Sequence, residues 1–225
     1  MNHIKPWQPI AVILLAVVLW YMRKKKMDGG ATTFAGQPPW AASTRPAVTK
    51  VVETPEVIYM NLRQEALAKS PERMGLPSDL KDDEPFGVLM EMAMPGDVVT
   101  LAGFADGDAG VYYKTGGGMK GGIFHDNVRK AAKEFVALSA TALPKMLKTT
   151  SFPLPGADKV RFYILTRKGI FTTEAPRQIL GTAKNDLSAL FYSGQEVVAQ
   201  MRQAQEDKAQ QRSGSEVPPA MMPSG

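Results

Sequence analysis

The chain has 225 residues, of which 44% are hydrophobic and 22% are charged, a composition typical of a folded domain rather than of a disordered chain. It contains no cysteine, which excludes disulfide bonds, thiolate metal sites and a cysteine nucleophile. The net charge of +5 arises within residues 1–26, which hold five cations and no acid, so the rest of the chain is neutral and we expect no nucleic-acid partner.

The N-terminal segment predicts a membrane anchor. An apolar run, residues 10–22, is followed at once by Arg23 and three lysines. The run is short for a membrane-spanning helix, but Trp7 and Trp20 stand where interfacial aromatic side chains are expected. No small-residue cleavage site follows the run. These flanks favour an uncleaved span of about residues 7–22, with a cleaved signal peptide and a peripheral helix as the alternatives.

The distribution of charge predicts how this anchor is oriented. Within residues 1–26, the cations after the span outnumber those before it, and the positive-inside rule then places the N-terminus outside and the body in the cytoplasm. We expect a single-pass protein of the inner (cytoplasmic) membrane, in contact with the lipid bilayer through residues 7–22. Residues 27–54 are rich in Gly, Pro, Ala and Thr and lack apolar periodicity, which predicts a flexible linker.

Residues 55–85 predict one helix and a connecting loop. Pro55 stands at the first helical position, where a missing N–H costs nothing. Ile58, Leu62 and Ala66 follow at the spacing of one helical face. The remainder of this region is polar and charged, which is typical of a solvated loop.

The globular domain is predicted within residues 86–205. Runs of β-branched and aromatic residues bounded by turn residues indicate three strands, at residues 86–94, 98–104 and 110–115. The Asp106-Gly107 pair between the last two strands favours a tight hairpin turn.

A helix, a second hairpin and another helix follow these strands. Asp126 is a favourable N-cap for the first helix, and alternating apolar residues indicate strands at 160–166 and 170–173. Asn185 and Asp186 are expected to cap the last helix, and residues 206–225 are predicted to be a disordered tail. The order βββ-α-ββ-α predicts an α+β domain, a two-layer antiparallel sheet with its helices on one face, preceded by the N-terminal transmembrane helix.

The glycine-rich loop at residues 115–122 is the candidate ligand-binding site. In other proteins, a glycine loop that leads into a helix binds phosphate through backbone N–H groups and the helix dipole. This loop lacks the spacing of a known phosphate-binding motif, so a purely structural loop is the favoured interpretation and a ligand or anion site is the alternative. The candidate residues are Gly116, Gly117, Gly118, Lys120, Gly121, Gly122 and His125.

Catalytic chemistry finds little support in the sequence. Asp106-Gly107-Asp108 lacks the further oxygen ligands of a calcium loop and is explained as a turn. His125 is a lone histidine, whereas a metal site needs three or four ligands and a hydrolytic triad needs a nucleophile in a recognisable setting. We therefore expect no catalytic residue, no metal and no cofactor, and an enzyme is the less expected class.

A resemblance covers about half of the chain. Residues 86–203, and above all 104–107, 112–118 and 191–196, look like a group of bacterial hypothetical proteins with no assigned activity, which share a DGxxxxYYxTGGG-type motif. The order of elements is also similar to that of roadblock and longin-type modules. That resemblance implies binding to GTPases or to a second module through an edge strand or a helix pair.

These observations favour one functional hypothesis and leave a second open. The leading hypothesis is a membrane-tethered cytoplasmic protein–protein interaction or scaffold module, whose partner is another protein. The alternative is a small-molecule or anion-binding sensor domain that uses the glycine-rich loop 115–122.

Overall fold

The structure, a computed structural model, describes residues 53–182 and 184–214. The predicted anchor, nearly all of the predicted linker and residues 215–225 of the predicted tail lie outside the described residues. Among the helices that are described, none combines the length and the apolar character needed to cross a membrane.

Seven antiparallel strands form one sheet in the order β4-β3-β2-β1-β6-β7-β5. The strands are β1 (Gly87–Met94), β2 (Asp97–Phe104), β3 (Ala109–Tyr113), β4 (Gly118–Met119), β5 (Leu147–Thr149), β6 (Lys159–Thr166) and β7 (Gly169–Pro176). The strand β1 is central, since it pairs with β2 on one side and with β6 on the other. The five longer strands follow the sequence prediction, because their apolar composition and their turns are local signals.

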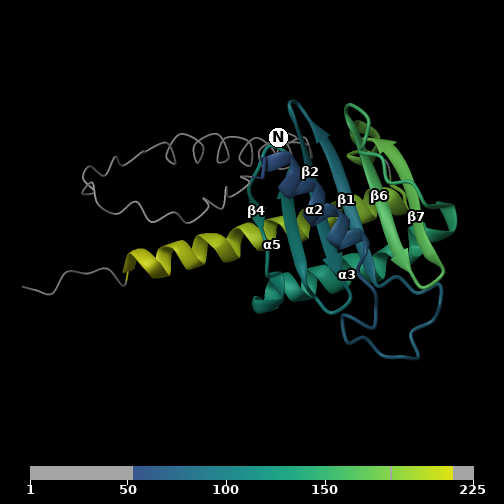
Figure 1. The fold of residues 1–225 in the computed structure, drawn as a ribbon, viewed down its shortest axis with the longest axis horizontal. Coiled ribbons are helices and arrows are strands. Elements are labelled where there is room, and N and C mark those ends of the chain that lie inside the picture. Colours follow the sequence, from purple (N-terminus) through teal and green to yellow (C-terminus); the bar gives the residue numbers. More distant parts are fainter. Residues whose placement is uncertain (1–52, 183, 215–225) are drawn as a thin grey trace, which may run out of the picture. The chain divides into compact units, whose positions relative to one another are not determined.

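Helices cover both faces of this sheet (Figure 1). They are α2 (Pro55–Leu67), α3 (Asp126–Ala142), α4 (Arg177–Leu180) and α5 (Asp186–Gly214), with two short 3-10 helices, η1 (Gly122–Phe124) and η2 (Leu143–Lys145). Figure 1 shows α2 on one face and α3 and α5 on the other. The predicted antiparallel α+β architecture is confirmed.

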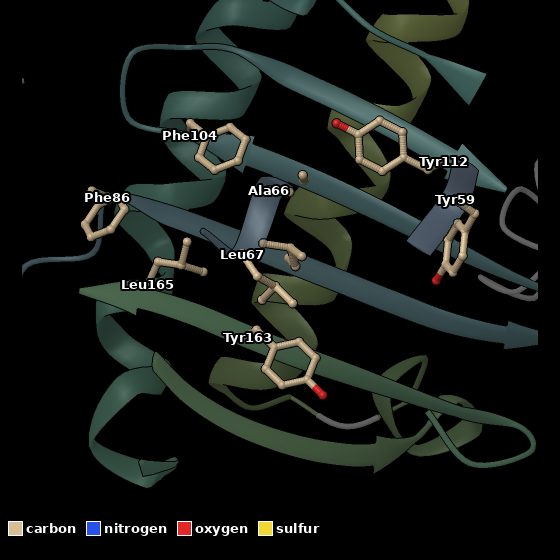
Figure 2. Packing of buried hydrophobic residues seen from close by; sticks show 10 residues of the cluster. Tyr59, Ala66, Leu67, Phe86, Phe104, Tyr112, Tyr163 and Leu165 are labelled. Carbon is tan, nitrogen blue, oxygen red and sulfur yellow. The ribbon is translucent and has the colours of Figure 1, made fainter. Parts of the chain in front are cut away.

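The predicted arrangement in two layers is wrong, because α2 adds a third. Tyr59, Ala66 and Leu67 form a buried side of α2 that packs against Leu89 and Tyr163 of the sheet (Figure 2). Successive side chains of a strand point to opposite faces. The face that holds Leu89 and Tyr163 is therefore opposite to the one that α3 and α5 cover, and both faces of the sheet are apolar.

The helix α5 packs closely against the sheet because a glycine stands at the contact. A Cβ atom built on Gly194 would lie 2.6 Å from Cε of Met90 in β1 and 3.2 Å from Cε2 of Phe135 in α3. A side chain at this position would force Met90 or Phe135 to move. Asn185 caps α5 as predicted, since its Oδ1 accepts a hydrogen bond from the backbone N–H of Ser188 at 3.0 Å.

Two predicted helix boundaries differ from the structure. The N-cap of α3 is His125, whose side chain makes no cap hydrogen bond, whereas Asp126 lies in the first turn beside Arg129. The helix α5 continues to Gly214, so residues 206–214 are helical rather than part of a disordered tail. Good helix-forming residues and side-chain hydrogen bonds one turn apart, such as Gln203 to Asp207 at 2.8 Å, extend it into solvent.

Candidate functional site

Most of the glycine-rich loop is a hairpin at the edge of the sheet. The backbone N–H of Gly116 donates to the carbonyl of Tyr113 at 2.9 Å, and the N–H of Tyr113 donates to the carbonyl of Gly117 at 3.2 Å. Gly116 and Gly117 have φ values of 109° and 84°, which side-chain-bearing residues rarely adopt. After the turn, Gly118 begins β4 and pairs with Tyr112 of β3. These three glycines therefore serve the change of chain direction.

The remaining candidate residues do not converge on one site. Gly122 is buried, and a Cβ atom there would lie 2.6 Å from Cγ1 of Val128, so it serves packing. Lys120 and Gly121 line a small cavity of about 90 Å³, whereas His125 at the start of α3 is not among its lining residues. The carboxylates of Glu65 and Asp108 line the same cavity and balance the charges of Lys69 and Lys120, so the cavity has no excess of positive charge to attract an anion.

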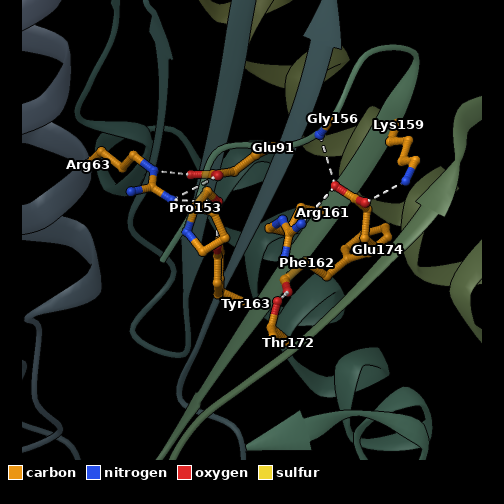
Figure 3. Close-up of polar contacts among 10 residues, drawn as sticks. All are labelled: Arg63, Glu91, Pro153, Gly156, Lys159, Arg161, Phe162, Tyr163, Thr172 and Glu174. Atoms are coloured by element: carbon orange, nitrogen blue, oxygen red, sulfur yellow. Dashed lines mark hydrogen bonds and ion pairs between the residues drawn. The ribbon is translucent and has the colours of Figure 1, made fainter. Parts of the chain in front are cut away.

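A buried polar network between α2 and the sheet was not predicted (Figure 3). Nε of Arg63 donates to Oε1 of Glu91 at 2.5 Å, and Nη2 donates to Oε2 at 3.0 Å. The two side chains are 4% and 0% exposed. Thr100 donates to Glu91 at 3.3 Å, and its hydroxyl also contacts the hydroxyl of Tyr59 at 2.8 Å. The network thus connects α2 with β1 and β2.

Arg63 also connects α2 to the irregular chain before β6. The carbonyl of Pro153 accepts a hydrogen bond from Nη2 of Arg63 at 3.4 Å and another from the hydroxyl of Tyr163 at 2.6 Å. The ring of Tyr163 contacts Phe152 edge to face, with the ring centroids 5.7 Å apart. Arg63 is therefore the side chain at which helix, sheet and loop meet, and its role is to fix α2 in place.

The electrostatics of this network follow from burial. Burial raises the pKa of the Glu91 carboxyl, and the hydrogen bonds and charge of Arg63 lower it only in part. Burial also raises the pKa of Tyr59 to about 12. For Arg63, burial lowers the pKa, but the hydrogen bond and charge of Glu91 outweigh it and raise the pKa. The guanidinium therefore stays charged, and its partner must remain beside it.

The sequence contains a signal for this pair. Glu91 interrupts an otherwise apolar strand, and Arg63 follows Tyr59 by four residues and precedes Leu67 by four, on the side of α2 that is buried. A charge in the centre of a buried strand requires a partner. Sequence reasoning missed it because the identity of that partner depends on which sheet face α2 covers.

A second cluster of charges lies on the same face of the sheet, at its edge. Glu174 on β7 accepts hydrogen bonds from the backbone N–H of Gly156 at 2.9 Å, from Nζ of Lys159 at 3.0 Å and from Nη2 of Arg161 at 2.9 Å (Figure 3). Burial raises the pKa of Glu174, but these three donors together outweigh it, so the pKa lies below its usual value. This cluster holds the loop before β6 against the hairpin of β6 and β7.

The outer side of α2 has the opposite character from its buried side. Val57, Ile58 and Met60 are 44%, 44% and 40% exposed. At about 100° of rotation per residue, Val57 points away from Tyr59, whereas Ile58 and Met60 lie on the two opposite flanks of the helix. We call these three side chains the outer apolar surface of α2.

The described part of the chain holds no candidate metal site. Across residues 53–182 and 184–214, no three histidine, aspartate or glutamate side chains come together as a metal site. Comparison of the chain with protein-family models, with curated proteins and with solved structures finds no match.

Proposed function

We propose that the chain is a membrane-tethered protein–protein interaction module whose body faces the cytoplasm and whose contact surface is the outer apolar surface of α2. The observation that carries the proposal is the exposure of Val57, Ile58 and Met60, three large apolar side chains within one turn near the start of α2. Apolar side chains that gather on a rigid element are the anchors from which protein–protein interfaces are built.

The buried side of α2 supports this proposal. Tyr59 is 1% exposed and Arg63 is 4% exposed. Their side chains form hydrogen bonds with Thr100 and Glu91 of the sheet. Because α2 is already held in place, binding of a partner to its outer side would not require the loss of conformational entropy that ordering a flexible helix requires. Recognition would follow the helix-in-groove mode, in which an apolar helix face enters a groove of the partner.

The position of α2 in the chain also fits a tethered module. The helix begins at Pro55, directly after the segment that the sequence predicts to be a linker from the membrane. A flexible tether keeps the module at the membrane and raises the effective concentration of a partner that is bound to the same surface. The positive-inside rule, applied to residues 1–26, supports a cytoplasmic position for this module.

Affinity capture from detergent-solubilised membranes tests the proposal. The full-length chain and a Val57→Ser, Ile58→Ser, Met60→Ser variant are compared. The matched control is Leu147→Ser with Ile179→Ser, which removes apolar side chains that are 77% and 51% exposed elsewhere on the domain. We expect a partner protein that is retained by the wild type and the control and is lost from the α2 variant. Equal retention by all three proteins would exclude α2 as the contact surface.

A further inference from the structure

A second hollow lies beyond the C-terminal end of α2. It has a volume of about 490 Å³, within the range that small-molecule sites occupy. The chain that follows α2 forms one wall and contributes Lys69, Glu72 and Asp82, and the turn between β6 and β7 forms the other wall and contributes Arg167. None of these residues belongs to the glycine-rich loop or to the outer apolar surface of α2.

The floor of this hollow is apolar. Leu67, Phe86 and Leu165 line it and are 9%, 4% and 1% exposed. They form one end of the apolar cluster between α2 and the sheet, as Figure 2 shows. The backbone N–H of Phe86 donates to the carbonyl of Leu165 at 2.9 Å, which fixes two of the three relative to one another. These three side chains are nearly covered by the protein itself, so they give the hollow a rigid floor and leave the polar rim as the part that a ligand can contact.

The rim carries charges of both signs. Nη2 of Arg167 lies 3.3 Å from Oε1 of Glu72, and the Glu72 side chain is 65% exposed. Nζ of Lys69 lies 3.0 Å from Oδ2 of Asp108 and 3.8 Å above the ring of Phe104. Ion pairs as exposed as that of Arg167 contribute little to stability, so its guanidinium is available to a ligand.

The wall that follows α2 is held to the opposite wall. The backbone N–H of Lys168 donates to the carbonyl of Asp82 at 2.9 Å, and Nζ of Lys168 lies 3.5 Å from Oδ2 of Asp83. The carboxylate of Asp82 has no ion pair within residues 53–182 and 184–214. The rim thus offers a weakly paired cation, Arg167, and an unpaired carboxylate on facing walls.

We propose that this hollow binds a small zwitterion, such as an amino acid or a short peptide with free termini. Arg167 receives the carboxylate and Asp82 receives the ammonium group, above the floor formed by Phe86 and Leu165. A ligand with a single charge would be repelled by the rim charge of the same sign, whereas a zwitterion matches both signs. The inference does not depend on the function proposed for α2.

Calorimetric titration of the full-length chain in non-ionic detergent tests this proposal. The probe is the dipeptide leucyl-phenylalanine, compared with its N-acetylated form, its C-terminal amide and the form with both caps. We expect the free dipeptide to bind, and each cap to weaken binding by about tenfold or more, because each removes a charge-assisted hydrogen bond. Equal binding of the doubly capped peptide, or no binding at millimolar concentration, would overturn the proposal.

Substitutions locate the binding to the hollow. Arg167→Gln and Asp82→Asn should each weaken binding of the dipeptide by about tenfold. Arg167→Gln should also abolish the difference between the free dipeptide and its amide. The matched control is Arg177→Gln, since Arg177 is exposed to a similar extent, 29% against 26%, and likewise faces a carboxylate, that of Asp158. Equal weakening by the control would place the binding elsewhere and refute the assignment.

Discussion

The buried ion pair between Arg63 and Glu91 leads to the sharpest prediction for stability. Arg63→Met removes the guanidinium but keeps a long apolar side chain, so it leaves Glu91 buried at 0% exposure without its partner. Breaking a buried pair in this way costs about 3–5 kcal/mol of the free energy of unfolding. Two hydrogen bonds to Glu91 and the one to the carbonyl of Pro153 are lost together.

Urea denaturation of residues 53–214, followed by circular dichroism, measures this loss. Replacing both partners, Arg63→Met with Glu91→Leu, should restore most of the stability, because no charge then remains buried. The control is Lys130→Gln, which removes one member of an exposed pair and should change stability by no more than about 0.5 kcal/mol. A loss below about 1 kcal/mol for Arg63→Met would show that the pair does not hold α2 on the sheet.

The pH dependence of the same variant follows from the raised pKa of Glu91. A carboxyl whose folded pKa lies above its unfolded value of about 4.5 binds its proton more tightly in the native state, so stability falls as the pH rises above that value. Without Arg63 the pKa of Glu91 lies higher still, because burial raises it and the hydrogen bonds and charge of Arg63 no longer lower it. Arg63→Met should therefore lose least stability in acid and most at neutral pH, and a constant loss across this range would contradict the argument.

Three further predictions concern other parts of the chain. Gly194→Ala should destabilise the domain by about 1 kcal/mol or more in thermal or urea denaturation, because the added methyl group meets Met90, whereas Gly181→Ala, with no atom closer than 3.6 Å, should not. Glu174→Gln should lower stability at pH 7 but not in strong acid. The folded pKa of Glu174 lies below its unfolded value, so the ionised carboxylate stabilises the fold above the unfolded pKa, and this contribution is lost as the pH falls through the folded pKa. The full-length protein should stay with membranes after an alkaline carbonate wash, and its release would refute the span predicted at residues 7–22.

Local signals explain which parts of the fold could be predicted from the sequence. The alternation of apolar residues in β6 and the turn residues that bound β2 are properties of a few consecutive residues, and they indicated these strands. The strands β4 and β5 have two and three residues, too few for any periodic pattern. They exist because β3 and β7 offer partners for their backbones. Length therefore separates the strands that sequence reasoning found from those that it missed.

The candidate site was harder to predict because it depends on contacts between distant residues. The glycines at 115–122 were a visible cluster, yet their positive φ values and close contacts serve a hairpin turn and the packing of α3. The Arg63–Glu91 pair and the outer apolar surface of α2 depend on one fact, the sheet face on which α2 lies. That face is decided by the packing of Tyr59 and Leu67 on residues from four strands, which no local pattern contains.

The central position of β1 has a consequence for how the chain is synthesised. One side of β1 pairs with β2, the next strand to leave the ribosome, but the other side waits for β6, at residues 159–166. Until then, β1 is the edge of an incomplete sheet, with Val88, Leu89 and Met90 beside unpaired backbone groups. Such an edge is a template for pairing with another chain. The interval between β1 and β6 is therefore the period in which the growing polypeptide depends most on slow release or on chaperones, and a chain that stops before β6 should aggregate.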